Sequence, residues 1–327
     1  MIAIAFLGTT LEARIANSQD VNKDSYLRAI ADRIITGPGD PADWGTNETV
    51  PTYFGLADSS LSASAYTLDS DKISRLNSQN IASLNYLDLE NSTRLTDIAL
   101  AITVTQIMNI EIEPISNQTI GNNITFDFRI STTINAQPNS ATLHCYVVTD
   151  ESLGAVNGTT NNSGSGSLTV QVPTVNLNDA LLVVFARSSF DDKITSYIIY
   201  TFADSKQETI PSNTELGLSP LNGNLNYNSS NGFSVQKVHA LTYSYQQTPT
   251  AEGSQFVIPA SIDHSPSVLV VCAGSVRGNV EEWTAYPQVP LSVGSNFANS
   301  ERNVFTYTVT IDGVLYDLQL SLGALNK

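Results

Sequence analysis

Apolar residues recur every three or four positions through the first 36 residues, a spacing that predicts amphipathic helix. A short apolar start, Met1–Leu7, leads into the first helical face, and a second helical stretch covers residues 18–36. The apolar residues of the two faces are Leu7, Leu11 and Ile15, followed by Leu27, Ile30 and Ile34. Gly37-Pro38-Gly39 ends the helix because it combines a chain-breaking proline with two flexible glycines.

Turns and short helices are predicted next. The segment GPGDPADWGTNETVPTYFGLA, residues 37–57, is rich in Pro and Gly and follows a path without regular structure. A short helix begins after Asp69, whose side chain is a suitable N-cap. Another short helical piece is expected over residues 92–100.

After about Thr103 the apolar period falls to two, which is typical of half-buried antiparallel strands. The alternating apolar positions are Ile110 and Ile112, then Ile124, Phe126, Phe128 and Ile130, then Leu143, Cys145 and Val147. Residues 156–166, VNGTTNNSGSG, are expected to form a flexible exposed loop. Near the end of the sequence, Asp312-Gly313 between two alternating segments predicts a β-hairpin with a type I′ turn.

The strand region contains an internal repeat. LLVVFARS at 181–188 resembles VLVVCAGS at 268–275, and LTVQVP at 168–173 resembles QFVIP at 255–259. Aromatic residues follow in step in both copies. Each copy has a length that suits one β-sandwich. The alternative is convergent strand composition, since Val-rich segments are common.

The pattern therefore predicts a mainly β chain with an N-terminal α-helical segment. Two tandem immunoglobulin-like antiparallel β-sandwiches follow the amphipathic helix. The expected domains are residues 1–102, a helical stalk or anchor with the turn-rich segment; residues 103–210, the first sandwich; and residues 211–327, the second sandwich.

Composition narrows the class of protein. The 327 residues include 15 Lys and Arg against 31 Asp and Glu, a net charge of -16, so a nucleic-acid partner is not expected. No apolar segment reaches the 18 or so residues that span a bilayer. Asn, Ser, Thr and Gly replace the missing charge, which favours an exported, extracellular or cell-surface protein. Cys145 and Cys272 are interpreted as buried small residues, with a disulfide between them as the alternative.

Seven N-x-S/T sequons are candidate N-glycosylation sites in an exported protein. Given this much Asn, Ser and Thr, about six such triplets are expected by chance. The acceptors are Asn47, Asn91, Asn117, Asn123, Asn157, Asn161 and Asn228.

No catalytic motif emerges, and no catalytic residue, metal ligand or cofactor is assigned. His144, His239 and His264 lie far apart in the sequence and in no metal-binding motif. Asp191-Asp192 and Glu281-Glu282 fall at corresponding places in the two repeats. Paired carboxylates serve glycoside hydrolysis or calcium binding, but solvated loop acids are the preferred interpretation here. The chain is therefore not expected to be an enzyme, and a β-sandwich hydrolase is kept as a distant alternative.

One resemblance to a known family rests on longer segments. The amphipathic helix, GPGDPADWG, PTYFGLA, YTLDSDKISRL, LLVVFARSSFDDKITSYIIYTF and SERNVFTYTVTIDGVLYDLQLSLG resemble archaeal type IV pilin-like and pseudopilin-like surface proteins. That resemblance implies an apolar, membrane-inserted N-terminal helix that carries an exported β-domain. Only Met1–Leu7 is apolar at the start of this sequence, so the rest of the apolar helix is expected upstream.

The resulting hypothesis is a non-catalytic surface protein that assembles through its N-terminal helix and displays β-sandwiches. Expected partners are further copies of itself or other pilin-like subunits, and the membrane if the helix extends upstream. Removal of residues 1–36 is then expected to leave a folded, soluble monomer. The alternative hypothesis is a carbohydrate- or surface-binding adhesin module, because aromatic residues, including 13 Tyr, suit the faces of sugar rings.

Overall fold

The described part of the chain begins with helices. A computed structural model describes residues 23–47, 49–60, 64–77, 80, 82–94, 98–149, 152–173, 180–202, 214–219, 224–229, 235–248, 250–252, 255–257, 269–274, 280–284, 289, 291–297 and 302–324. A helix over residues 23–36 ends before Gly37, as predicted. Two shorter helices follow, α2 (Ser70–Ser74) and α3 (Tyr86–Thr93). The side chain of Asp69 accepts hydrogen bonds from the backbone of Asp71 and Lys72, which confirms the predicted N-cap.

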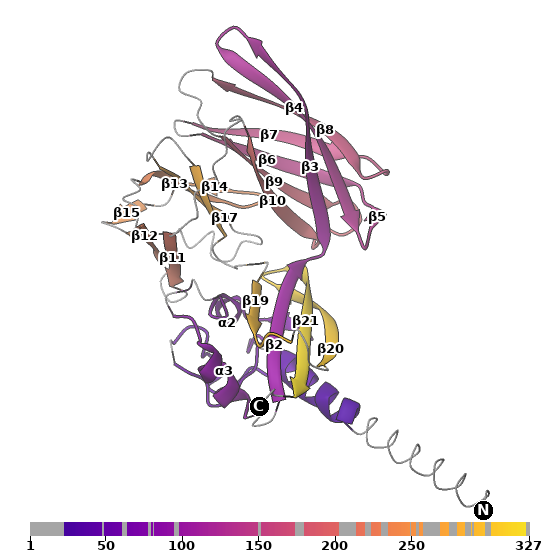
Figure 1. The fold of residues 1–327 in the computed structure, drawn as a ribbon, viewed down its shortest axis with the longest axis vertical. Helices are drawn as coiled ribbons and strands as arrows, with labels where there is room; N and C mark the ends of the chain where they lie inside the picture. Colours follow the sequence, from indigo (N-terminus) through magenta and orange to yellow (C-terminus); the bar gives the residue numbers. More distant parts are fainter. Residues whose placement is uncertain are drawn as a thin grey trace, which may run out of the picture.

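A five-stranded sheet lies beside these helices (Figure 1). Its strand order is β1–β20–β21–β2–β19, and all neighbours are antiparallel except β1 and β20. The strands are β1 (Thr67–Leu68), β2 (Ile98–Gln106), β19 (Leu291–Gly294), β20 (Arg302–Ile311) and β21 (Val314–Ala324). We call the described residues of 23–106 and 289–324 the base. The helix predicted over 92–100 is wrong: of its described residues only 92 and 93 are helical, as the end of α3, and the short apolar segment from Ile98 pairs as a strand.

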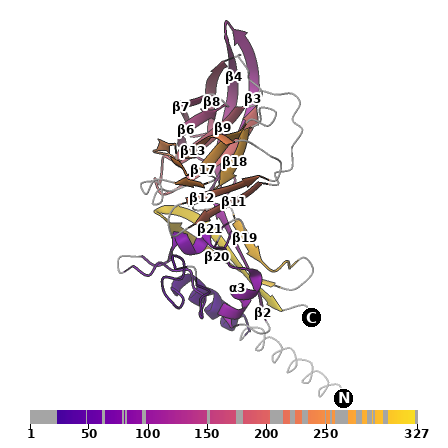
Figure 2. The ribbon, with the colours of Figure 1, turned by 90° about the vertical axis from the view of Figure 1, so that its left-hand side faces the viewer.

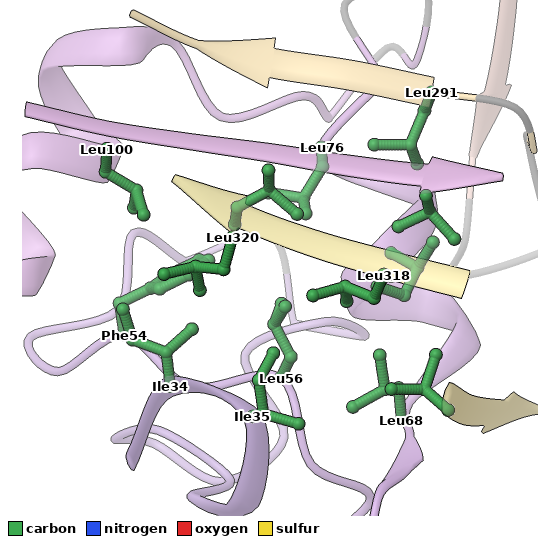
Figure 3. Packing of buried hydrophobic residues seen from close by; sticks show 14 of the residues in the cluster. Ile34, Ile35, Phe54, Leu56, Leu68, Leu76, Leu100, Leu291, Leu318 and Leu320 are labelled. Carbon is green, nitrogen blue, oxygen red and sulfur yellow. The ribbon is translucent and has the colours of Figure 1, made fainter. Parts of the chain in front are cut away.

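The base has one hydrophobic core between its sheet and the covering helices and loops. From the helix over residues 23–36, Ile34 and Ile35 point toward the sheet, where Leu318 and Leu320 meet them (Figure 3). Phe54 from the turn-rich segment belongs to the same cluster. That segment is fixed from inside, since the buried Trp44 ring donates a 2.9 Å hydrogen bond from Nε1 to the Gly55 carbonyl.

The predicted C-terminal hairpin is confirmed. Ile311 pairs with Val314, and Asp312 and Gly313 both have positive φ angles, +47° and +83°, as a type I′ turn requires. The hairpin then pairs with β2 through β21, from Ile98 opposite Ala324 to Gln106 opposite Tyr316. Strands β1 and β2 thus share one sheet with the C-terminal strands β19, β20 and β21, which fall in the predicted second sandwich, residues 211–327. The three domain limits themselves remain predictions.

Between β2 and β19 the chain makes a long excursion, which we call the insert: the described residues of 107–284. Its first part contains two sheets, β10–β9–β6–β7 and β3–β4–β5 with β8 beside β4, which enclose one hydrophobic core. The strands are β3 (Met108–Ile120), β4 (Asn123–Ile134), β5 (Gln137–Pro138), β6 (Ala141–Val148), β7 (Leu153–Thr160), β8 (Ser165–Pro173), β9 (Ala180–Ser188) and β10 (Thr195–Phe202). The loop expected over residues 156–166 is therefore wrong, since most of that segment lies in β7 and the start of β8.

The second part of the insert repeats the strand order of the first. Sheet β18–β17–β13–β14 matches β10–β9–β6–β7, and β11–β12–β16 matches β3–β4–β8. The segments that resemble each other in sequence occupy equivalent strands, namely β8 and β16, and β9 and β17. The strands are β11 (Thr214–Ser219), β12 (Asn224–Ser229), β13 (Val235–Leu241), β14 (Gln246–Gln247), β15 (Thr250–Glu252), β16 (Gln255–Val257), β17 (Leu269–Gly274) and β18 (Val280–Thr284). A mainly β fold with an N-terminal helix is thus confirmed.

The insert lies at one end of the base, and the helix over residues 23–36 lies at the other end in both views (Figures 1 and 2). A single residue, 107, separates β2 from β3. Beside this link the Gln106 side chain is hydrogen-bonded to the backbone N–H and carbonyl of Tyr197 in β10, and the Tyr197 hydroxyl donates to the Val289 carbonyl at 2.6 Å. Tyr197 of the insert is thus bonded to the base at Gln106, where the chain enters the insert, and at Val289, where the chain returns to the base.

Candidate functional site

The helix residues predicted to anchor or assemble the chain divide into two groups. Leu7, Leu11 and Ile15 lie outside the described residues. Leu27 and Ile34 are buried in the core of the base, and the partly buried Ile30 packs against that core. A side chain buried within its own chain is not available as a seam between subunits. The assembly role therefore stays a prediction that concerns the first group.

The same burial changes the expectation for a chain that lacks residues 1–36. Such a chain would lose four fully or nearly fully buried side chains, those of Leu27, Ala31, Ile34 and Ile35. The hydrogen bond from the Tyr307 hydroxyl of β20 to Asp32, 2.8 Å long, would be lost as well. We therefore expect the base to unfold when the helix over residues 23–36 is removed. None of the described helices is long and apolar enough to cross a membrane.

The insert carries a candidate binding site, an open groove of about 510 Å³ on the outer face of sheet β10–β9–β6–β7. We call it the Tyr243 groove. It is lined by Thr142, Leu143, His144, Asn157, Gly158, Thr159 and Tyr243. Strands β6 and β7 belong to the first part of the insert, whereas Tyr243 follows β13 in the second part. The groove therefore lies where the two parts meet, a common location for ligand sites.

The register of the strands explains the polar floor of the groove. Thr142 of β6 lies opposite Arg187 of β9 on one side and Thr159 of β7 on the other. Two residues further along β6, His144 lies opposite Asn157. Residues directly opposite each other, or two apart on one strand, point to the same face of a sheet. The other face packs into the hydrophobic core, so the polar residues gather on the outside.

Tyr146 fixes the turn that carries Tyr243. This buried tyrosine projects from β6 and donates from its hydroxyl to the carbonyls of Thr242 and Tyr245, at 3.0 and 3.3 Å. The backbone N–H of Thr242 also donates to the Tyr245 carbonyl at 2.8 Å and closes the turn. Burial raises the pKa of Tyr146 to about 12, so the hydroxyl keeps its proton and remains a donor at neutral pH.

Aromatic contacts orient the wall of the groove. The rings of His144 and Tyr146 stack with centroids 4.8 Å apart, and Tyr243 approaches His144 edge to face at 6.1 Å. The Arg187 guanidinium lies 3.8 Å from the centroid of the Tyr243 ring, while its Nε donates to the Thr195 hydroxyl at 3.1 Å. A cation over a tyrosine face is attracted by the ring quadrupole. The ring of Tyr243 is thus held by contacts on two sides.

Neither of the acidic pairs considered in the sequence analysis lines the Tyr243 groove. Asp191 and Asp192 lie in the turn between β9 and β10, where an Asp191 carboxylate oxygen accepts the backbone N–H of Lys193 at 3.0 Å. Glu281 and Glu282 lie within strand β18, so the expectation that the two pairs occupy corresponding places is wrong. Across the part of the chain that the structure describes, no three His, Cys, Asp or Glu side chains are grouped to hold a metal ion.

Six of the seven sequon asparagines have exposed side chains: Asn47, Asn91, Asn117, Asn123, Asn157 and Asn161. The seventh, Asn228, lies in β12, and its side chain is outside the described residues. Asn157 is notable because it lines the Tyr243 groove. The exposed positions are accessible to modification, and glycosylation itself stays a prediction.

Cys145 is a free thiol buried in the core between the two sheets of the first part of the insert. Burial raises its pKa to about 12, which keeps the sulfur protonated and unreactive. The interpretation of Cys145 as a packing residue is confirmed, and the alternative, a disulfide to Cys272, is not formed. The side chain of Cys272 is outside the described residues.

Comparisons with known proteins give no family. No family model matches the chain, and no curated protein matches it. Among solved structures, OgpA from Akkermansia muciniphila aligns with a TM-score of 0.19 and 14% identity over 29% of this chain and 27% of that chain. HBP35 of Porphyromonas gingivalis aligns with a TM-score of 0.21 and 10% identity over 59% of this chain and 65% of that chain. The chain spans less than two thirds of either protein, and at these scores the likeness identifies neither a fold nor a function.

Sequence reasoning missed the groove as a site. His144 is predicted only as a strand histidine outside any metal-binding motif, and no motif marks Tyr243. The usable signal was the alternation in TLHCYVV, residues 142–148, which places Thr142, His144 and Tyr146 on the face opposite the core. Nothing in the sequence indicates that a turn about 100 residues later covers that face, so the groove itself was not predictable.

Proposed function

We propose that this chain is a non-catalytic subunit of the cell surface, pilin-like in plan, in which the base is anchored and the insert faces outward. One observation carries the proposal: the whole insert is placed between two neighbouring strands of a helix-covered sheet. Leu291 of β19 pairs with Val104 of β2, so the chain returns beside the point where it left. Such an excursion extends the molecule away from the N-terminal helix without interrupting the base.

The insert is further proposed to consist of two tandem immunoglobulin-like β-sandwiches that arose by duplication. The equal strand order of the two parts supports this proposal, as does the resemblance of β9 to β17 in sequence. Two sheets around one core, as in the first part, are the architecture of a sandwich.

The N-terminal helix is the proposed means of attachment and assembly. The helix over residues 23–36 is integrated in the core of the base, which supports a firm connection between the base and the segment that precedes it. Leu7, Leu11 and Ile15 form the proposed apolar seam toward other copies or other pilin-like subunits, or toward the membrane if the apolar helix extends upstream. An archaeal, type IV pilin-like origin and an extracellular location belong to this same proposal.

The alternative function, a carbohydrate- or surface-binding adhesin module, is favoured by a specific feature, the Tyr243 groove. It lies on the insert, the part proposed to face outward. Display and binding are compatible functions of one molecule, so the alternative extends the first proposal and does not compete with it.

The test uses the full chain with a C-terminal epitope, produced in its source cells. Protease added to intact cells is expected to remove the epitope, and protection until lysis would refute surface display. Substituting Leu7, Leu11 and Ile15 together with Ser is expected to release folded protein into the medium. As a matched control, Ser at the exposed apolar Tyr26 and Leu87 should leave the protein in the cell-surface fraction. A triple variant that stays in that fraction would refute the apolar seam.

A further inference from the structure

We propose that the Tyr243 groove binds a neutral saccharide. This inference deepens the proposed function, because it gives the displayed insert a ligand. It rests on the geometry of the groove and is measured on purified protein, whereas surface display is measured on cells. Either can therefore fail while the other stands.

The first argument is the polar character of the groove. Its exposed floor residues, Thr142, Asn157 and Thr159, offer hydroxyl and amide groups. Each of these groups both donates and accepts hydrogen bonds. A sugar hydroxyl does the same, so a ring with several hydroxyls can satisfy this floor and be satisfied by it. A ligand that only accepts or only donates would leave half of these groups without a partner.

The second argument is the aromatic wall. Sugar rings have an apolar face of C–H groups, which packs on the electron-rich face of an aromatic ring. Tyr243 lines the groove, and two residues of β6 hold it in place. The Tyr146 hydroxyl donates to the carbonyl of the preceding residue, Thr242, and the His144 ring contacts the Tyr243 ring. Arg187 lies over one face of the Tyr243 ring and is itself fixed to Thr195, so the sugar is proposed to pack on the other face. A wall that is already ordered costs little conformational entropy when a ligand arrives.

The third argument is charge. The lining residues include no carboxylate, and the bordering Arg187 is already engaged by the Tyr243 ring and the Thr195 hydroxyl. The chain as a whole has a net charge of -16, which repels anions over long distances. A neutral sugar avoids this repulsion and needs no ionic partner. The groove volume of about 510 Å³ is within the range of small-molecule sites, about 300–1,000 Å³.

Asn157 sets one condition for the experiment. It is both a lining residue and the acceptor of an N-G-T sequon, so a glycan attached there would fill the groove. The full chain is therefore produced in a host without N-glycosylation. The probes are methyl glucosides, galactosides and mannosides, together with lactose, maltose, cellobiose and chitobiose. Saturation-transfer NMR at millimolar saccharide detects binding, and titration gives the Kd.

The expected result is binding of at least one neutral saccharide, with an affinity that falls about tenfold or more in Tyr243→Ala. Tyr245→Ala is the matched control, because this half-exposed tyrosine shares the turn but does not line the groove. It should bind as the unchanged protein does. The double variant Thr142→Val and Thr159→Val keeps two exposed β-branched residues on their strands, so its fold is preserved, and its affinity should fall about fivefold.

Three results would overturn the inference. One is the absence of binding by every neutral probe at millimolar concentration. Another is a saccharide that binds equally well to the unchanged protein, to Tyr243→Ala and to the double threonine variant. The third is tighter binding of glucuronic or sialic acid than of any neutral sugar, which would show that the groove selects a carboxylate.

Discussion

Replacing Ile35 with Ala tests whether the helix over residues 23–36 is part of the core of the base. Ile35 is fully buried in that core. The substitution removes three carbon groups, each worth about 0.8 kcal/mol of transfer free energy, or about 2.4 kcal/mol together. The cavity that remains adds to this loss, so the free energy of unfolding should fall by about 3 kcal/mol.

The control for this experiment is Leu87→Ala in α3. It removes the same number of carbon atoms from a side chain that is 67% exposed. The free energy of unfolding should then change by only about 0.5 kcal/mol or less. A comparison of the two variants therefore isolates the effect of burial from that of the deleted atoms.

Urea unfolding followed by tryptophan emission provides the assay. The chain has two tryptophans, so a Trp283→Phe background leaves Trp44, which is buried in the base, as the reporter. With a slope of about 2 kcal/mol per molar urea, the midpoint of Ile35→Ala should fall by about 1.5 M. A midpoint within the range of the Leu87→Ala control would refute the placement of the helix in the core. The seam proposal would then extend to Leu27, Ile30 and Ile34.

Three further predictions concern titratable groups. The hydrogen bond from Thr169 lowers the pKa of Asp127 below its usual value near 3.8. The ionised carboxylate therefore stabilises the fold above about pH 3.8, and this stabilisation is lost as the pH falls through the lowered pKa of the folded state. NMR titration should show the low pKa of Asp127, and Thr169→Val should raise that pKa. Burial raises the pKa of Cys145 to about 12, so iodoacetamide at about pH 8 should alkylate the native thiol far more slowly than the urea-unfolded thiol, and equal rates would contradict its burial. Burial, followed by the hydrogen bond to Asp32, raises the pKa of Tyr307 above its usual value near 10. That contribution to stability is complete below about pH 10 and falls at higher pH, so Tyr307→Phe should show a smaller loss of urea stability between about pH 9 and pH 11 than the unchanged protein.

Local patterns predicted local structure well. The glycine and proline after Thr36, the N-cap at Asp69 and the turn at Asp312-Gly313 each act within a few residues, and each is found where the sequence indicates. Alternation also located β3, β4 and β6 of the insert, because one face of each strand must meet the core. The order of the repeated segments 168–173 and 181–188 is reproduced by the equivalent strands of the second part.

The errors came from strands whose composition opposes their structure and from pairings over long distances. Residues 156–160 are VNGTT, a polar, glycine-containing segment that forms β7 because β6 offers it a partner along its whole length. Likewise, nothing near Ile98 in the sequence shows that its partner is Ala324. The Tyr243 groove depends on both kinds of information, which is why the sequence did not reveal it.

The attachment of the insert has a mechanical consequence. Both connections leave the same end of two adjacent antiparallel strands, β2 and β19, and the first described residues lie at the opposite end of the base. A pull on the insert against the N-terminal helix is therefore directed along the axis of β2. The hydrogen bonds of an antiparallel ladder are perpendicular to the strands, so this force shears them together and does not peel them one by one. All nine residue pairs between β2 and β21 would therefore share such a load at once.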